Sequence, residues 1–159
     1  HRSFTAEPPD VIFQEKPFEL ALEHDVVVTG RIDQVNRLSG RKVEIVDYKT
    51  GKVRDAKKAA EDIQLSVYAL AAREVLDLEP ERLVFYYLVN NEAVATTRDA
   101  KSLAAAKEKI AEVADQIRAQ DFPAKPSYMC GYCDYKPLCP AHEQLISIQP
   151  RAANPEEEK

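Results

Sequence analysis

Three segments in the first third of the chain are rich in apolar and β-branched residues, a composition that favours strands. They are residues 12–22, which Pro17 interrupts, residues 26–37 and residues 42–49. The stretch Leu38-Ser39-Gly40-Arg41 between the last two segments is turn-like. We therefore predict an antiparallel hairpin that places the second strand beside the third.

The rest of the chain combines helical and strand patterns. Residues 59–76 are strong helix formers that follow a polar loop at residues 50–58, and residues 102–119 carry apolar side chains at helical spacing. Residues 83–89 are aromatic and β-branched, and residues 93–97 return beside them after an Asn90-Asn91 turn. The pattern predicts an α/β fold in which helices flank a mixed sheet.

Length, composition and charge limit the possibilities. A chain of 159 residues that is 45% hydrophobic has room for one core, so we expect a single domain over residues 1–149 and a disordered polar tail over residues 150–159. No apolar stretch reaches membrane-spanning length and no signal peptide opens the sequence, so the expected location is the cytoplasm. The formal net charge is −5, yet residues 31–58 hold nine Lys or Arg against four Asp or Glu. That local excess suits a polyanionic substrate, although a solvated lysine-rich face gives the same pattern.

Asp33 and the triplet Asp47-Tyr48-Lys49 are residue types that suit phosphodiester hydrolysis. Side chains alternate between the two faces of a strand, so Asp47 and Lys49 share one face and Tyr48 points to the other. The hairpin brings Asp33 beside Asp47, and two carboxylates can hold Mg²⁺ or Mn²⁺. Such a metal polarises a phosphate and activates water, while Lys49 orients that water or stabilises developing charge. A D-x-K pattern alone is also typical of solvent-facing residues that pair with Lys49 or Arg31.

Gln64 and Tyr68 lie four residues apart in the predicted helix and therefore share one of its faces. From that face they can contact a nucleotide or the water network of the site. The alternative is that Tyr68 belongs to the core and that Gln64 caps the end of a strand.

Three short motifs of the sequence resemble the core motifs of the PD-(D/E)XK nuclease superfamily, in its RecB-type branch. The resemblance is carried by Gly30-Arg31-Ile32-Asp33, by Ile45-Val46-Asp47-Tyr48-Lys49-Thr50-Gly51 and by Gln64-Leu65-Ser66-Val67-Tyr68-Ala69. It implies a restriction-endonuclease-like core in which Asp33, Asp47 and the main-chain carbonyl of Tyr48 bind the metal and Lys49 is catalytic. It also implies that Gln64 and Tyr68 lie beside the active site and complete it.

Cys130, Cys133 and Cys139 lie together in a C-x₂-C-x₅-C segment interleaved with Gly, Pro and aromatic residues. Thiolates suit zinc and iron–sulfur clusters, and His142 can supply the fourth ligand of a zinc site. The RecB-type resemblance instead implies a [4Fe-4S] cluster completed by a distant N-terminal cysteine, which this sequence lacks. We therefore expect free thiols, a disulfide or a makeshift zinc site in this chain and an intact cluster only in a longer parent protein.

The resemblance implies a Mg²⁺- or Mn²⁺-dependent deoxyribonuclease, an exonuclease in preference to a site-specific endonuclease. It points to the C-terminal nuclease domain of a helicase-nuclease in DNA repair or recombination, with the helicase in the same polypeptide or in a partner subunit. Because the first helix of such domains is missing, we expect an N-terminally truncated fragment with weak or no activity alone. The alternatives are a stand-alone CRISPR-adaptation nuclease, a non-catalytic DNA-binding domain with a nuclease fold, and a zinc or redox module built on the cysteines.

Overall fold

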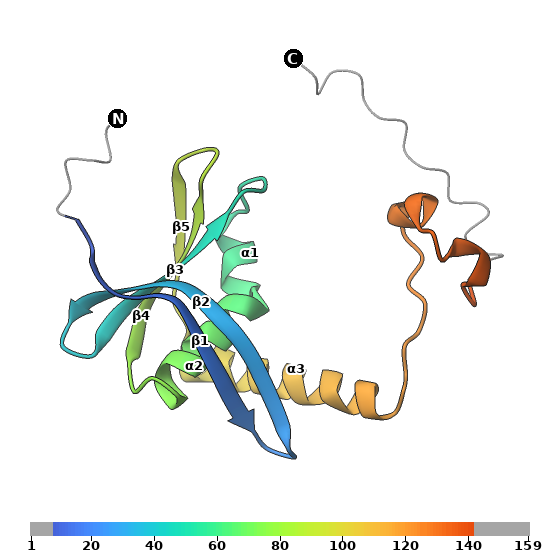
Figure 1. Cartoon of the computed structure of the whole chain (residues 1–159), viewed down its shortest axis with the longest axis horizontal. Coiled ribbons are helices and arrows are strands. Elements are labelled where there is room, and N and C mark those ends of the chain that lie inside the picture. The colour runs from blue at the N-terminus through green and yellow to red at the C-terminus, as the bar shows by residue number, and fades with distance from the viewer. Residues whose placement is uncertain (1–7, 142–159) are drawn as a thin grey trace. The chain divides into compact units, whose positions relative to one another are not determined.

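The computed structural model describes residues 8–141 of the chain. The chain divides into two compact units, residues 1–115 and residues 116–159. The first unit contains a five-stranded sheet with the strand order β1-β2-β3-β4-β5 (Figure 1). Its strands are β1 Asp10–Leu22, β2 Val26–Ser39, β3 Lys42–Lys49, β4 Glu79–Tyr87 and β5 Glu92–Thr96. β3 and β4 are parallel whereas the other neighbours are antiparallel, so the prediction of a mixed sheet is confirmed.

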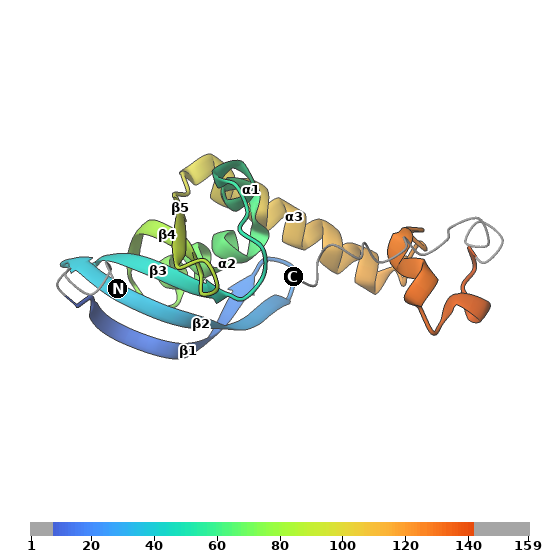
Figure 2. The ribbon, with the colours of Figure 1, turned by 90° about the horizontal axis from the view of Figure 1, so that it is seen from above.

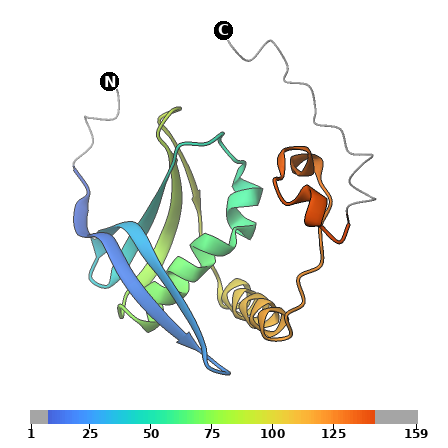
Figure 3. The ribbon, with the colours of Figure 1, turned by 45° about the vertical axis from the view of Figure 1, so that its right-hand side comes forward.

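Helices cover one face of this sheet. They are α1 Ala56–Glu61, α2 Ile63–Glu74 and α3 Ala100–Arg118, the last of which continues into the second unit. Within the first unit, α1, α2 and the start of α3 lie on the same side of the strands (Figures 2 and 3). The α/β class predicted from the sequence is therefore confirmed, with the helices on a common side. No helix among the described residues is long and apolar enough to cross a membrane.

The predicted single helix over residues 59–76 was wrong, because two short helices meet at Asp62. The first begins at Ala56, inside the expected polar loop, where the Asp55 carboxylate accepts the Lys58 N–H at 2.8 Å. Asp62 accepts the Gln64 N–H at 2.9 Å in the same way. An aspartate in extended conformation that caps the next turn starts a new helix, so each of these residues sets a boundary that apolar spacing does not reveal.

The hairpin of β2 and β3 forms as predicted, and the two strands then separate. Their pairing runs from Ser39↔Lys42 to Gln34↔Val46. Residues 26–32 of β2 pair with β1 but not with β3. Beyond the region shared with β3, β1 and β2 therefore continue as a two-stranded ribbon (Figure 1). Pro17 does not interrupt β1, since an edge strand tolerates a missing N–H. The separation falls at Asp33.

The core lies between the sheet and α2. Alternate residues of β3 and β4 join a buried cluster with residues of α2: Val43, Ile45, Leu83, Phe85 and Tyr87 from the strands, and Leu65, Tyr68 and Ala69 from the helix. Burial of one strand face fixes the register, since a slip by one residue would expose the whole row. Asp47 and Lys49 continue the row of Val43 and Ile45, so their side chains point to the helix-covered face.

The described part of the second unit, residues 116–141, carries the cysteines on short turns. Two 3₁₀ helices, η2 Tyr128–Tyr132 and η3 Lys136–Leu138, contain no buried side chain. Cys130, Cys133 and Cys139 are free thiols, and Cys130 Sγ accepts the Ser127 N–H at 3.2 Å. The expected disordered tail at residues 150–159 and the proposed ligand His142 lie outside the described residues.

Candidate active site

Asp47 and Lys49 lie side by side at the end of β3, on the face predicted from strand alternation. The Asp47 carboxylate is 2% exposed, and its Oδ2 atom lies 2.5 Å from the Lys49 ammonium nitrogen. Burial raises the pKa of Asp47; the neighbouring Lys49 ammonium lowers it, and the charge of Asp33 raises it further. The alternative of a solvent-facing ion pair is therefore wrong for Asp47, which is a buried carboxylate next to a cation.

Asp33 reaches this pair from the neighbouring strand. Its Oδ2 accepts the main-chain N–H of Tyr48 at 2.9 Å, beyond the last backbone pairing of β2 with β3. The carboxylate thus takes the place of a strand carbonyl at the point where the two strands part. Asp33 lies close enough to Asp47 for its charge to raise the pKa of Asp47.

Tyr48 points to the opposite face of the sheet, as the alternation predicts. Its hydroxyl donates to Gln34 Oε1 at 3.0 Å, and its ring meets the ring of Tyr86 edge-on with centroids 5.9 Å apart. The main-chain N–H of Tyr48, and not its phenol, is hydrogen-bonded to Asp33. The predicted role of Tyr48 therefore concerns its main-chain carbonyl and not its phenol.

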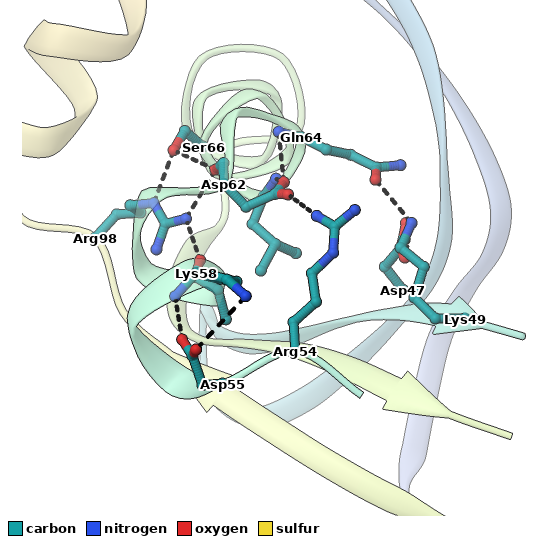
Figure 4. A network of polar contacts seen from close by, with 11 residues as sticks. Asp47, Lys49, Arg54, Asp55, Lys58, Asp62, Gln64, Ser66 and Arg98 are labelled. Atoms are coloured by element: carbon teal, nitrogen blue, oxygen red, sulfur yellow. Dashed lines mark hydrogen bonds and ion pairs between the residues drawn. The ribbon is translucent and has the colours of Figure 1, made fainter. Parts of the chain in front are cut away.

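Gln64 and Tyr68 extend the polar site from the strand to α2. The Lys49 ammonium donates to Gln64 Oε1 at 2.8 Å, and Gln64 Nε2 donates to the Tyr68 hydroxyl at 2.9 Å (Figure 4 shows the pair of Lys49 and Gln64). Burial raises the pKa of Tyr68 to about 12, so its phenol stays protonated at neutral pH. The structure thus brings Asp33, Asp47, Lys49, Gln64 and Tyr68 into one contiguous network, and Tyr68 is at once a core residue and part of the site.

A close contact behind Tyr68 was not predicted from the sequence. The Phe18 ring meets the Tyr68 ring edge-on, with centroids 6.1 Å apart, and it packs over Gly30 on the paired strand. A Cβ atom at Gly30 would lie 2.6 Å from Cζ of Phe18, closer than side-chain atoms approach. Gly30 is therefore needed for space and not for backbone conformation. The signal was present in the sequence as the glycine three residues before Asp33.

A buried arginine also holds the site, and the sequence gave no reason to single it out. Arg98 is 6% exposed and binds the α1–α2 corner from the end of β5 (Figure 4). Its guanidinium donates to Ser66 Oγ at 2.7 Å and to the main-chain oxygens of Ala59 and Asp62 at 2.9 Å each. Burial lowers the pKa of Arg98 below its ordinary value, and the charge of Asp62 opposes that shift. Because Asp62 caps α2, this arrangement fixes the helix that presents Gln64.

The donor set fits a hard divalent cation with two protein carboxylates. Asp47 Oδ2 is buried and, although at ion-pair distance from Lys49, accepts no hydrogen bond from the described residues. Mg²⁺ and Mn²⁺ bind carboxylate oxygens and keep several waters, so two carboxylates suffice. The described part of the chain contains no group of three or more His, Cys, Asp or Glu side chains placed to hold a metal. That finding applies to the cysteine segment as well, as far as residue 141.

Comparisons with known proteins agree with this geometry. The PD-(D/E)XK nuclease superfamily matches residues 2–140 of the chain. The Gene 69 protein of Mycobacterium phage L5 is 31% identical over 133 residues, which are 79% of this chain and 43% of the phage protein. The chain thus spans less than half the length of that curated relative. The crystal structure of SSO0001 aligns with a TM-score of 0.51 at 17% identity, over 82% of this chain and 60% of that one, which shows a shared fold.

Proposed function

Because this chain belongs to the PD-(D/E)XK nuclease superfamily, we propose that it hydrolyses phosphodiester bonds of DNA with a divalent cation. The observation that carries the proposal is the meeting of Asp33, Asp47 and Lys49 where β2 and β3 separate. A buried carboxylate whose oxygen accepts no hydrogen bond costs about 1–3 kcal/mol of stability or more. A site that keeps such a group is suited to bind a cation, since the cation supplies the missing partner.

Each residue of the network has a distinct role in this proposal. Asp33, Asp47 and the Tyr48 carbonyl hold Mg²⁺ or Mn²⁺, which when bound polarises the phosphate and lowers the pKa of water. Lys49, fixed between Asp47 and Gln64, places its charge beside the reacting phosphate and orients the attacking water. Gln64 restricts the ammonium by accepting a hydrogen bond from it. Tyr68, protonated throughout the neutral range, orients the Gln64 amide.

The proposal extends to the biological setting in which this domain acts. Because its motifs resemble those of the RecB-type branch, we propose that the domain is a RecB-type exonuclease, the C-terminal domain of a helicase-nuclease in DNA repair or recombination. A stand-alone CRISPR-adaptation nuclease is the alternative. In either setting Cys130, Cys133 and Cys139 belong to a [4Fe-4S] site that needs a fourth ligand from elsewhere. Iron and acid-labile sulfide analysis of the purified protein tests that assignment.

The test is cleavage of labelled DNA by purified protein with Mg²⁺ or Mn²⁺ and with excess chelator. Asp47→Asn and Lys49→Gln should each lower the cleavage rate by about 10²-fold or more, because one removes a ligand and the other the charge at the phosphate. Asp77→Asn and Lys42→Gln are matched controls, since both residues are exposed and lie away from the site. They should cleave like the wild type.

Circular dichroism and urea denaturation establish that each variant is folded. Full cleavage by a folded Asp47→Asn protein, or equal cleavage in chelator, would contradict the mechanism. A wild-type chain that binds DNA but cleaves none with either metal would favour a non-catalytic DNA-binding domain with a nuclease fold.

A further inference from the structure

A cavity of about 390 Å³ opens beside the candidate active site, and its wall is basic. Lys49 belongs to both, because its ammonium contacts Asp47 and its side chain lines the cavity. The other cations of the wall are Lys52 and Arg54, from the segment that joins β3 to α1, and Lys58 of α1. Among the described residues that line this cavity, none is acidic. We call this feature the basic cavity.

The floor of the basic cavity is apolar and closed. Phe85 and Tyr87 lie beneath it and are 0% and 2% exposed, so no aromatic face is open for a base to stack on. The Lys49 ammonium stands 5.1 Å from the centre of the Phe85 ring. A rigid floor with a rim of cations suits the backbone of a nucleic acid better than its bases.

The acidic partners of Arg54 and Lys58 are committed to helix starts. Asp62 accepts the N–H of Gln64 and also pairs with Arg54 at 3.2 Å, whereas Asp55 accepts the N–H of Lys58 and lies 3.9 Å from its ammonium (Figure 4). The Arg54 and Lys58 side chains remain 57% and 68% exposed. Exposed single ion pairs of this kind are weak, so these cations keep most of their capacity to bind an anion.

We propose that the basic cavity binds the phosphates adjacent to the scissile one on the same strand, an inference that rests on the proposed nuclease function. Lys49 marks the reacting phosphate, and Lys52, Arg54 and Lys58 neutralise the next ones along the backbone. Because these contacts are to phosphate, they hold the strand without selecting a base sequence.

A second hollow in the first unit provides a matched control. Arg41, Lys42 and Arg73 line it together with Glu79 and Glu81, so its charge is mixed. Lys42 begins β3 and Lys49 ends it, which separates the hollow from the candidate site by about 23 Å at about 3.3 Å per residue. Removing two cations from either place changes the net charge equally.

The experiment compares Lys52→Gln/Lys58→Gln with Arg41→Gln/Lys42→Gln in the full chain. Arg54 is kept, because its partner Asp62 caps α2. Fluorescence anisotropy in EDTA measures binding of a labelled oligonucleotide, as a single strand and as a duplex, between about 50 and about 200 mM salt. The slope of log K against log salt is negative. In the Lys52→Gln/Lys58→Gln protein its magnitude should be smaller than in the wild type, by about 1.4 for the single strand or about 1.8 for the duplex. The control protein should keep the wild-type slope.

Hydrolysis of bis(p-nitrophenyl) phosphate, a diester without neighbouring phosphates, separates strand binding from damage to the site. The Lys52→Gln/Lys58→Gln protein should hydrolyse it like the wild type while KM for the oligonucleotide rises. Equal slopes for the two double variants, or parallel loss of bis(p-nitrophenyl) phosphate hydrolysis, would overturn the proposal. If the wild type cleaves DNA but the Lys52→Gln/Lys58→Gln protein keeps the wild-type slope, the phosphate-binding role of the basic cavity is refuted and the nuclease function stands. A reduced slope in a chain that never cleaves refutes the nuclease function and leaves the cavity as a backbone-binding site.

Discussion

Replacement of Asp47 by asparagine is expected to stabilise the metal-free protein at neutral pH while it abolishes cleavage. The Asp47 carboxylate is 2% exposed, and its Oδ2 accepts no hydrogen bond from the described residues. Such an acceptor costs about 1–3 kcal/mol, and the ion pair with the partly exposed Lys49 offsets about 1 kcal/mol of it. The neutral amide also removes repulsion from Asp33. We expect a gain of about 1 kcal/mol, or about 2–4 °C in Tm for a chain of this length.

The gain should depend on pH in a defined direction. Burial raises the pKa of Asp47 above 3.8, so the folded wild type binds this proton more tightly than the unfolded chain. The wild-type penalty is therefore full above the raised pKa and shrinks as pH falls through it. Below about pH 3.8 the carboxyl is protonated in both states and the penalty is gone. The advantage of Asp47→Asn over the wild type should shrink along the same path.

Urea denaturation in EDTA at pH 7 and at about pH 4 measures both effects. Added Mg²⁺ then tests the ligand role, because saturation to a hundred times Kd stabilises a binding protein by about 2.7 kcal/mol. The wild type should gain this stability and Asp47→Asn should gain little of it. A variant that is less stable than the wild type at pH 7 in EDTA would refute the reasoning about the buried carboxylate. Equal stabilisation of both proteins by Mg²⁺ would refute the assignment of Asp47 as a ligand.

Two further substitutions test how the site is held in place. Gly30→Ala should destabilise the fold by about 1–3 kcal/mol in urea denaturation, since its Cβ would lie 2.6 Å from Phe18. Gly51→Ala is the control, because a Cβ there meets open space, and it should change stability by less than about 0.5 kcal/mol. Arg98→Met should cost about 3 kcal/mol or more, because it leaves the buried oxygens at the α1–α2 corner without donors. Arg82→Met, which removes an exposed arginine from its pair with Glu44, should cost about 1 kcal/mol or less. An Arg98→Met protein as stable as Arg82→Met would contradict the role of the buried guanidinium.

Strand alternation and the family motifs were enough to locate the residues of the candidate site. Alternation in β3 correctly put Asp47 and Lys49 on one face, because burial of Val43 and Ile45 leaves only one register. The spacing of four between Gln64 and Tyr68 correctly put both on one helix face. These features are local, and a periodic sequence records them directly.

The supporting contacts are not local, and the sequence could not show them. Arg98 binds acceptors that lie more than 30 residues away in the chain. Phe18 of β1 contacts Tyr68 of α2, which is also distant in the sequence. The break at Asp62 was missed for a different reason. Apolar spacing runs through the capping residue without a gap, so only the cap geometry reveals that one helix ends there and another begins.

The parting of β2 and β3 explains why the candidate site is found where it is. Strands that separate leave main-chain donors without ladder partners, and such donors need another acceptor. Asp33 supplies that acceptor to Tyr48 through Oδ2 and at the same time brings a carboxylate next to Asp47. With Oδ2 committed to the main chain, Oδ1 of Asp33 is the oxygen left to face a cation. The hydrogen bond that secures the parting strands therefore also orients a metal ligand. Asparagine at position 33 can keep the acceptor but loses the charge. The Asp33→Asn protein should therefore fold normally and lose cleavage.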